Sequence, residues 1–225
     1  TDLEEIYKDL HSHPELGFEE VRTSEIVQKK LKEYGVDEIH TNIGKTGVIG
    51  VIKGNGAGGN RSVGLRADMD ALPIQETTGL SYASKYHGKM HACGHDGHTT
   101  MLLGAARHLA KTRNFNGTAI LIFQPAEEGR GGAVKMIEEG LFSKFPCDEI
   151  YGIHNDPNGK NGEIGICKGT AMAGAVFFDI NIKGKGGHAA MPHQSTDPII
   201  IANDLISQLQ SVVSRNVPPL DSLVL

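Results

Sequence analysis

Ala119-Ile120-Leu121-Ile122-Phe123 is the stretch of the sequence that says most about the fold. Such a short, continuous apolar run does not suit an amphipathic helix and is typical of a strand that is buried on both faces. The run Ile150-Tyr151-Gly152-Ile153 has the same character, and residues 48–52 and 63–65 are two further short apolar runs. The sequence therefore predicts several short strands, of which 119–123 and 150–153 are buried on both faces.

Segments with helical spacing of apolar residues lie before and between these runs. Residues 2–34 contain two such segments, separated by His13-Pro14-Glu15-Leu16-Gly17, because proline disfavours helix at the preceding residue and glycine weakens it. Residues 99–111 and 131–139 are expected to form further helices. Strands that alternate with helices indicate an α/β fold, with a largely parallel sheet and helices on both of its faces.

The pattern changes after about residue 169. Residues 175–185 alternate apolar and polar side chains in their second half, as in a strand of a different sheet with one face in water, and a helix is expected from 198 to about 214. We predict an incomplete catalytic domain over residues 1–172 and the start of a second domain over 173–225. The second part is too short to close a domain of usual size, so the chain is expected to be a fragment.

Composition and charge exclude several classes of protein. The 225 residues are 39% hydrophobic and 22% charged, which argues against a disordered, collagen-like or disulfide-stapled chain. The formal net charge of −5, without a long basic run, disfavours nucleic acid or an acidic membrane as a partner. The sequence shows neither a membrane-spanning apolar stretch nor a signal peptide at its amino terminus. We expect a cytoplasmic protein that acts on a small molecule.

Acidic and histidine side chains follow the expected strands at the points where these strands end. In open α/β sheets, ligands bind at the carboxyl ends of the strands, so these side chains are expected to share one edge of the sheet. A set of polar residues scattered over the surface would not show this arrangement. The residues are Asp68 and Asp70, Glu127 and Glu128, and His154.

The densest group of candidate ligands is His91-Ala92-Cys93-Gly94-His95-Asp96-Gly97-His98, directly before the helix expected from residue 99. Cys93 and His95 would point to different sides of a regular helix, but an irregular turn with glycines can direct both inward. Thiolate and imidazole are good ligands for zinc and similar divalent ions. A single histidine here would more often cap a helix. The cluster, beside acids on neighbouring strand ends, favours a metal site.

Glu127 and Glu128 are adjacent, so their side chains diverge and can take two different roles in a hydrolytic site. One carboxylate can bind a metal while its neighbour acts as general base toward water, whose pKa a bound ion lowers toward about 7. The alternative is that both glutamates are solvated surface residues of a loop without a function. Their position directly after a buried strand disfavours this interpretation. Dinucleotide, P-loop and nucleophile-elbow motifs are absent from the sequence, which weakens nucleotide-binding and serine-hydrolase interpretations.

Together these motifs resemble the M20 metallopeptidase family. The resemblance is to its aminoacylase-like amidohydrolase branch, which includes hippurate hydrolases, N-acyl-L-amino acid amidohydrolases and auxin-conjugate amidohydrolases. One such string would be weak evidence for a family, whereas five strings in the order in which the family has them are specific evidence. The strings are His13-Pro14-Glu15-Leu16-Gly17-Phe18-Glu19-Glu20, Leu65-Arg66-Ala67-Asp68-Met69-Asp70-Ala71-Leu72-Pro73, His91 to His98, Phe123-Gln124-Pro125-Ala126-Glu127-Glu128-Gly129 and Gly186-Gly187-His188-Ala189-Ala190-Met191-Pro192-His193.

The resemblance implies one or two divalent metal ions, of zinc, manganese, cobalt or nickel, held by Cys93, His95, Glu128 and His154, with Glu127 as general base. The implied reaction is hydrolysis of the amide bond of N-acyl amino acids of the hippurate or N-acetyl type. One alternative is a carboxypeptidase or dipeptidase of the same superfamily, but Cys93 in place of a bridging carboxylate favours the amidohydrolase branch. Another is a non-catalytic metal-dependent binding or dimerising module, which would not need both glutamates.

The resemblance also implies an inserted α+β lid that forms a homodimer and begins near Met172. On it, His188 is similar to a family histidine that helps to stabilise the tetrahedral oxyanion, often across the dimer; the alternative is a turn histidine without contact to the reaction. Asp70 aligns with an aspartate that orients a ligand. Asp68 stands where other branches place a ligand histidine, so no direct ligand role is expected for it. Because relatives supply a further ligand histidine later in their sequences, these 225 residues alone are expected to bind metal weakly and to hydrolyse substrate poorly.

Overall fold

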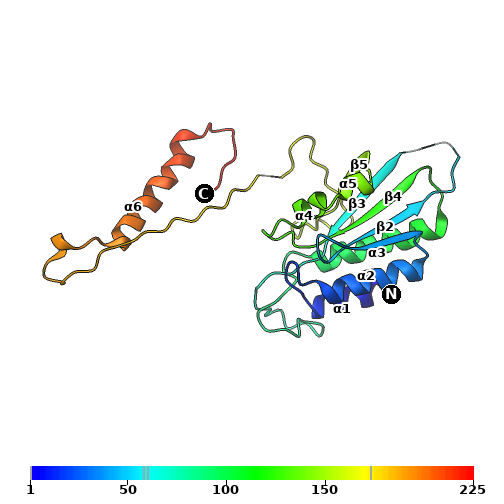
Figure 1. Ribbon diagram of the computed structural model, residues 1–225, viewed down its shortest axis with the longest axis horizontal. Helices are drawn as coiled ribbons and strands as arrows, with labels where there is room; N and C mark the ends of the chain where they lie inside the picture. Colours follow the sequence, from blue (N-terminus) through cyan, green and yellow to red (C-terminus); the bar gives the residue numbers. More distant parts are fainter. Residues whose placement is uncertain (1, 58, 60, 173) are drawn as a thin grey trace. The chain divides into compact units, whose positions relative to one another are not determined.

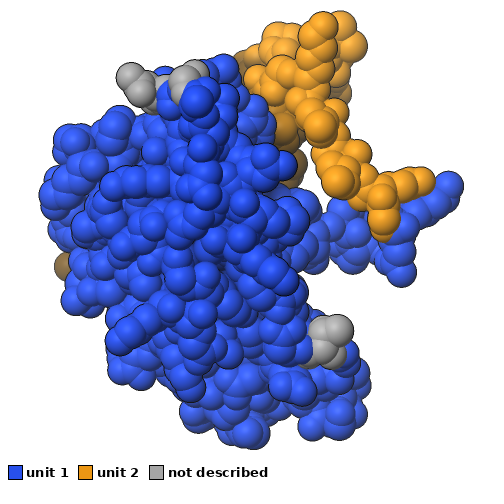
Figure 2. Space-filling model, turned by 90° about the vertical axis from the view of Figure 1, so that its right-hand side faces the viewer, with its two compact units in different colours: residues 1–161 blue, residues 162–225 orange. Residues whose placement is uncertain are grey.

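The chain divides into two compact units, residues 1–161 and 162–225, in the computed structural model (Figure 2). The structure describes residues 2–57, 59, 61–172 and 174–225. All the predicted metal ligands belong to the first unit, and His188 belongs to the second. The domain boundary predicted between residues 172 and 173 falls inside the second unit and stays a prediction.

The first unit is a five-stranded sheet with helices on both faces (Figure 1). The strand order is β1-β2-β4-β3-β5; β3 is parallel to β4 and β5, and β2 is antiparallel to β1 and β4. All strands except β2 therefore run in one direction, which confirms the predicted α/β fold. In chain order the elements are α1 (Asp2–Ser12), α2 (Val21–Tyr34), β1 (Glu38–Ile43), β2 (Gly47–Lys53), β3 (Ser62–Asp68), α3 (His95–Thr112), β4 (Thr118–Gln124), α4 (Gly132–Glu138), α5 (Leu141–Lys144) and β5 (Glu149–Gly152).

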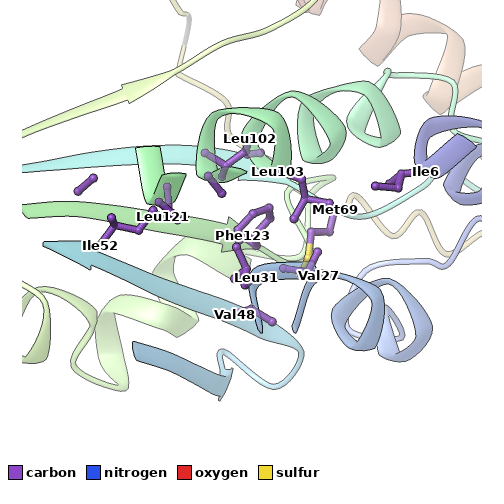
Figure 3. Packing of buried hydrophobic residues seen from close by; sticks show 14 of the residues in the cluster. Ile6, Val27, Leu31, Val48, Ile52, Met69, Leu102, Leu103, Leu121 and Phe123 are labelled. Atoms are coloured by element: carbon purple, nitrogen blue, oxygen red, sulfur yellow. The ribbon is translucent and has the colours of Figure 1, made fainter. Parts of the chain in front are cut away.

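Strand β4 is the centre of the core, as its apolar run predicts. Ala119, Leu121 and Phe123 pack on the side of α1, α2 and α3, whereas Ile120 and Ile122 pack on the other side with residues of α4 and α5. Figure 3 shows Phe123 beside Leu121 and the side chains from α2 and α3. Burying each of the larger side chains stabilises the fold by about 1.5–3 kcal/mol, so the strand end that carries the candidate site is held in a rigid layer.

The helices begin and end close to the predicted positions. The break between α1 and α2 falls at residues 13–20, and α2 ends at Gly35, whose φ of +76° lies in the left-handed region that favours glycine. Helix α3 begins at His95, earlier than the predicted residue 99, so that His95 and His98 lie in its first turn. This earlier start places both imidazoles in the buried first turn of α3.

Two strand predictions need correction. Residues 150–153 were expected to be buried on both faces, but Ile150 and Tyr151 in β5 are 46% and 57% exposed, because β5 lies at an edge of the sheet and pairs with β3 alone. Apolar content does not distinguish an edge strand from a central one. Strand β1 carries no comparable apolar run and was not predicted; it forms by antiparallel pairing with β2.

The second unit contains a 3-10 helix (η1, Pro192–Gln194), a longer helix (α6, Pro198–Ser211) and a π-helical turn (η2, Val212–Asn216). Asp197 caps α6 by accepting a hydrogen bond from the Ile199 amide, and the helix predicted from residue 198 is confirmed. The strand predicted over 175–185 is wrong. Residues 175–184 form no strand, and an isolated bridge joins Lys185 to Thr196, because the described residues of this unit provide no longer strand with which the segment could pair.

Among the described residues, the structure contains no helix that is both long enough and apolar enough to cross a membrane.

Candidate metal centre

The candidate site lies where β3, β4 and β5 end together. Because these strands are parallel and in register, with Asp68 opposite Gln124 and Arg66 opposite Gly152, the segments that follow them leave the sheet at the same edge. The amino-terminal turn of α3 meets this edge, since the hydroxyl of Thr99 donates to the carbonyl oxygen of Asp68 at 2.8 Å. The strand-end placement that the sequence predicts is therefore the one observed.

His95 is the residue common to three groups of potential ligands. In each group the ligand atoms lie within 4.8 Å of one another. The predicted ligands Cys93, His95 and His154 form one group, and His95 joins Glu127 and Glu128 in another. The third group is Asp68, His95 and His98, which are all buried. The structure thus brings the other three predicted ligands and the predicted base around the imidazole of His95.

The free ring nitrogen of His95 is the clearest sign of a cation site. The side chain is 1% exposed, and its Nδ1 lies 3.2 Å from Oδ1 of Asp70. Its Nε2 is buried without a hydrogen-bond partner. The carboxylate oxygens around that nitrogen belong to Asp68 at 3.6 Å, Glu128 at 3.9 Å and Glu127 at 4.0 Å. A buried polar atom without a partner costs about 1–3 kcal/mol, which coordination to a cation would recover.

Asp70 connects His95 to the turn after β4. Its Oδ1 also accepts the backbone N–H of Glu127 and its Oδ2 accepts that of Glu128, each at 3.0 Å. Burial raises the pKa of this carboxyl, but the hydrogen bonds from His95 and from the two amides outweigh burial and leave the pKa below its usual value. In the neutral His95 ring, an ionised Asp70 that accepts from Nδ1–H leaves the Nε2 lone pair facing the carboxylates of Asp68, Glu127 and Glu128. This is the geometry that an orienting residue requires.

Cys93 and His154 approach each other from separate segments, with 3.5 Å between Sγ and Nε2. Nδ1 of His154 lies 2.8 Å from the carbonyl oxygen of Asn155. Because only N–H can donate to a carbonyl, the neutral ring would carry its lone pair on Nε2, which faces Cys93. Burial, together with Glu128, raises the pKa of the Cys93 thiol to about 12. In this surrounding of carboxylates, a nearby cation would be needed to hold the thiolate form.

A buried pair of residues, His98 and Asp68, contacts the segments that carry the predicted ligands. Nδ1 of His98 lies 2.7 Å from Oδ1 of Asp68, and Nε2 of His98 lies 3.0 Å from the backbone nitrogen of Asn155. Burial raises the pKa of the Asp68 carboxyl, but the hydrogen bond with His98 and the charge of Arg66 outweigh it and lower the pKa to about 2.

His98 belongs to the cluster of candidate ligands at residues 91–98, but no specific role was predicted for it, and none for Asn155. The spacing of His98 three residues after His95 is a usable signal once both lie in a helix, because such residues share a face. No comparable signal marks Asn155.

His188 lies in the second unit, in the glycine-rich segment before η1. Its Nδ1 accepts a hydrogen bond from the backbone N–H of Ala190 at 3.1 Å, and the side chain is exposed. Its contact with a reacting oxyanion stays a prediction.

Comparison with known proteins agrees with the chemistry of this site. The model of the family "Peptidase family M20/M25/M40" matches residues 64–221, more than half of the chain. Hippurate hydrolase of Campylobacter jejuni is 52% identical over 99% of this chain and 57% of its own length. N-acetyl-L-cysteine deacetylase of Bacillus subtilis is 48% identical over 98% of this chain and 52% of its own length. IAA-amino acid hydrolase ILR1-like 4 of Arabidopsis thaliana is 46% identical over 97% of this chain and 49% of its own length. The chain spans about half the length of these curated relatives.

Solved structures show the same relationship. The YXEP protein of Bacillus subtilis, described as a dinuclear metal binding peptidase from the M20 family, is 45% identical over 70% of this chain and 43% of its own, with a TM-score of 0.65. A protein from methicillin resistant Staphylococcus aureus is 36% identical over 98% of this chain and 58% of its own, with a TM-score of 0.77. With the family match and these identities, the chain belongs to peptidase family M20 and to its amidohydrolase branch.

Proposed function

We propose that the protein at its natural length hydrolyses the amide bond of N-acyl amino acids with the help of a bound divalent metal ion. The observation that carries this proposal is the buried, unpartnered Nε2 of His95, which faces the carboxylates of Glu127 and Glu128 beside the Cys93–His154 pair. This set of one sulfur, two ring nitrogens and carboxylate oxygen suits zinc and other borderline divalent ions.

In the proposal Cys93, His95, Glu128 and His154 hold the metal. When bound, the ion would supply Lewis acidity, which lowers the pKa of water and polarises the substrate carbonyl. The half-buried Glu128, 27% exposed, is the better placed of the two glutamates to serve as a ligand. Asp70 keeps the His95 ring in the orientation that presents Nε2.

Glu127 is the proposed general base. Its side chain is 40% exposed, more than that of Glu128, so it can reach both the water and the substrate. In the reaction a carboxylate oxygen of Glu127 takes a proton from the attacking water and then delivers that proton to the leaving nitrogen of the amino acid. The lid histidine, His188, would stabilise the oxyanion that forms on the acyl carbonyl.

The names of the similar proteins support the substrate class. Hippurate, N-acetyl-L-cysteine and auxin conjugates of amino acids share an amino acid whose nitrogen carries an acyl group, while the acyl group differs. We therefore propose a site that recognises the amino acid part and the amide. The proposal extends to one or two ions of zinc, manganese, cobalt or nickel, to a homodimer formed through residues 173–225, and to a cytoplasmic location.

The variant Glu127→Gln tests the proposal in the metal-loaded protein at its natural length. Rates are measured with benzoyl-glycine and with a dipeptide, and metal content is measured by mass spectrometry. We expect benzoyl-glycine to be the better substrate and the variant to lose about 10²–10⁴-fold in kcat with its metal retained. Glu138→Gln, on the exposed side of α4, is the matched control. If Glu127→Gln kept more than about a tenth of the rate, Glu127 would not be the base; preference for the dipeptide would favour a peptidase.

A further inference from the structure

Three consecutive backbone amides of the turn after β4 donate to buried carboxylates from other parts of the chain. Ala126 donates to Oε1 of Glu20 at 2.8 Å, and the next two amides, of Glu127 and Glu128, donate to Asp70. Ala126 has a φ of +50°, in the left-handed region that residues other than glycine adopt infrequently. Such a conformation persists where the surrounding structure enforces it, and here two carboxylates do so.

The Glu20 carboxylate is fully buried and has uncharged donors. Its exposed fraction is 0%, and its second oxygen accepts the hydroxyl proton of Thr46 at 2.6 Å. Among the described ion pairs none involves Glu20. Burial raises the pKa of this carboxyl, and the hydrogen bonds from Thr46 and Ala126 partly offset the increase. A carboxylate without a cationic partner is costly to bury, so the contacts that Glu20 makes at this place call for an explanation.

Glu20 is not needed to cap its own helix. It occupies the N-cap position of α2, where a carboxylate would ordinarily accept an amide of the first turn, but it makes no such bond. Glu15 does this instead, by accepting the amides of Arg22 at 3.0 Å and Thr23 at 2.8 Å. Glu20 is thereby free to contact Ala126, which is 106 residues away in the sequence.

We propose that Glu20 is a positioning residue for the reaction. It holds Ala126 and, together with Asp70, fixes the directions in which Glu127 and Glu128 leave the turn. The inference rests on the proposed function for what these two glutamates do, whereas the fixing of the turn can be tested without metal or substrate. Positioning of this kind matters because a displacement of about 1 Å at a reacting group can cost about 10²-fold in rate.

The first test measures amide hydrogen exchange in the metal-free protein at its natural length. Mass spectrometry of peptides that cover residues 124–131 compares Glu20→Ala, Glu20→Gln and the wild type. We expect exchange at Ala126 to be at least about tenfold faster in Glu20→Ala. In Glu20→Gln it should stay near the wild-type rate, since the glutamine oxygen can accept from Ala126 and its NH₂ group can donate to Thr46. Unchanged exchange in Glu20→Ala would overturn the proposal.

The matched control is Glu19→Gln. Glu19 is the exposed neighbour of Glu20, and its carboxylate pairs with Lys89 at 3.2 Å on the surface. This variant should leave exchange in the 124–131 peptides unchanged. Should Glu20→Ala fail to fold, Thr46→Val replaces it, because it removes the hydroxyl that holds the second carboxylate oxygen. Exchange at Ala126 is then expected to rise by about threefold, and no increase would count against the proposal.

The second test is kinetic and spectroscopic. In folded, cobalt-loaded protein, Glu20→Ala should lower kcat for benzoyl-glycine by about 10–100-fold with little change in KM, and Glu20→Gln should restore most of it. The visible spectrum of the bound cobalt should shift as Glu128 moves. A purely structural role would lower stability but leave kcat and spectrum of the folded molecules unchanged. If the wild type hydrolyses no N-acyl amino acid, the proposed function fails, while the exchange result still decides whether Glu20 fixes the turn.

Discussion

The imidazole of His98 and the carboxylate of Asp68 form a fully buried hydrogen bond, with 2.7 Å between Nδ1 and Oδ1. This bond joins the first turn of α3 to the end of β3. Because Nε2 of His98 also lies 3.0 Å from the amide of Asn155, the same side chain holds the segment that carries His154. His98, which we do not expect to bind the metal, thus holds His95 on α3 and His154 after β5 in position relative to each other.

Replacing His98 with alanine is expected to weaken metal binding by about 10–100-fold, because residues that orient ligands typically contribute this much. The free energy of unfolding should fall by about 1–3 kcal/mol, since Asp68 and the Asn155 amide lose a buried partner. Zinc titration calorimetry and urea denaturation measure the two effects. His108→Ala, an exposed histidine of the same helix, is the control and should change neither. Normal zinc affinity in His98→Ala would show that His154 is held in another way.

The pH dependence of stability should reveal His11. Its Nδ1 lies 2.6 Å from Asp96 and its Nε2 lies 3.3 Å from Glu76. A protonated imidazole therefore joins α1 to α3 and to the segment between β3 and α3, which carries Glu76. The hydrogen bond with Asp96 raises the pKa of His11 above 6.5, although burial opposes it. The protonated form is therefore favoured by folding. Its contribution is complete below pH 6.5 and is lost as the pH rises through the raised pKa of the folded state.

Urea denaturation of wild type and His11→Gln across pH 5–9 tests this expectation. The difference in the free energy of unfolding should be largest at the acidic end and shrink as the pH rises. A difference that grows with pH would mean that His11 is neutral in the folded protein.

Gly132 is expected to tolerate no side chain, because a Cβ built there would lie 1.7 Å from the carbonyl oxygen of Pro125. Its amide also donates to the carbonyl oxygen of Ala126 at 2.9 Å, so α4 begins in contact with the turn that carries Glu127. Gly132→Ala should lower the free energy of unfolding by about 1–3 kcal/mol, as overpacked substitutions do. In Gly159→Ala the new Cβ meets its neighbours at ordinary contact distances, so the midpoint of thermal unfolding should stay near that of the wild type.

Burial explains which strands can be predicted from the sequence. Strand β4 is buried from Ala119 to Gln124, so its composition records its place in the sheet. Strand β5 has the same apolar character but lies at an edge of the sheet. Within the part of the second unit that the structure describes, the alternating segment 175–185 pairs through the single bridge at Lys185. Local composition reports what a residue prefers to contact. It does not report which partner strand the rest of the chain supplies.

The same distinction applies to the site. Asp70, His95, Glu127 and Glu128 stand at strand ends or in a conspicuous cluster, where local signals and family resemblance both mark them. Glu20 has no such signal, because its contact with Ala126 joins positions 106 residues apart. The contact between His98 and Asp68 likewise spans 30 residues. Residues that position others in this way become recognisable once the fold brings them together.

Metal binding should stabilise the first unit, because a ligand that binds the folded state alone adds RT ln(1 + [L]/Kd) to its free energy of unfolding. Zinc at about a hundred times its Kd is expected to add about 2.7 kcal/mol, which a chelator should remove. In Cys93→Ser the weaker ligand should raise Kd at least about tenfold, so the same zinc concentration stabilises at least about 1.3 kcal/mol less. Urea denaturation with zinc and with chelator measures both.

Cys147→Ser is the control for this prediction. It changes a half-buried thiol beside Gly64, away from the candidate ligands, and should retain the full zinc effect. Equal stabilisation of the two variants would exclude Cys93 from the metal site.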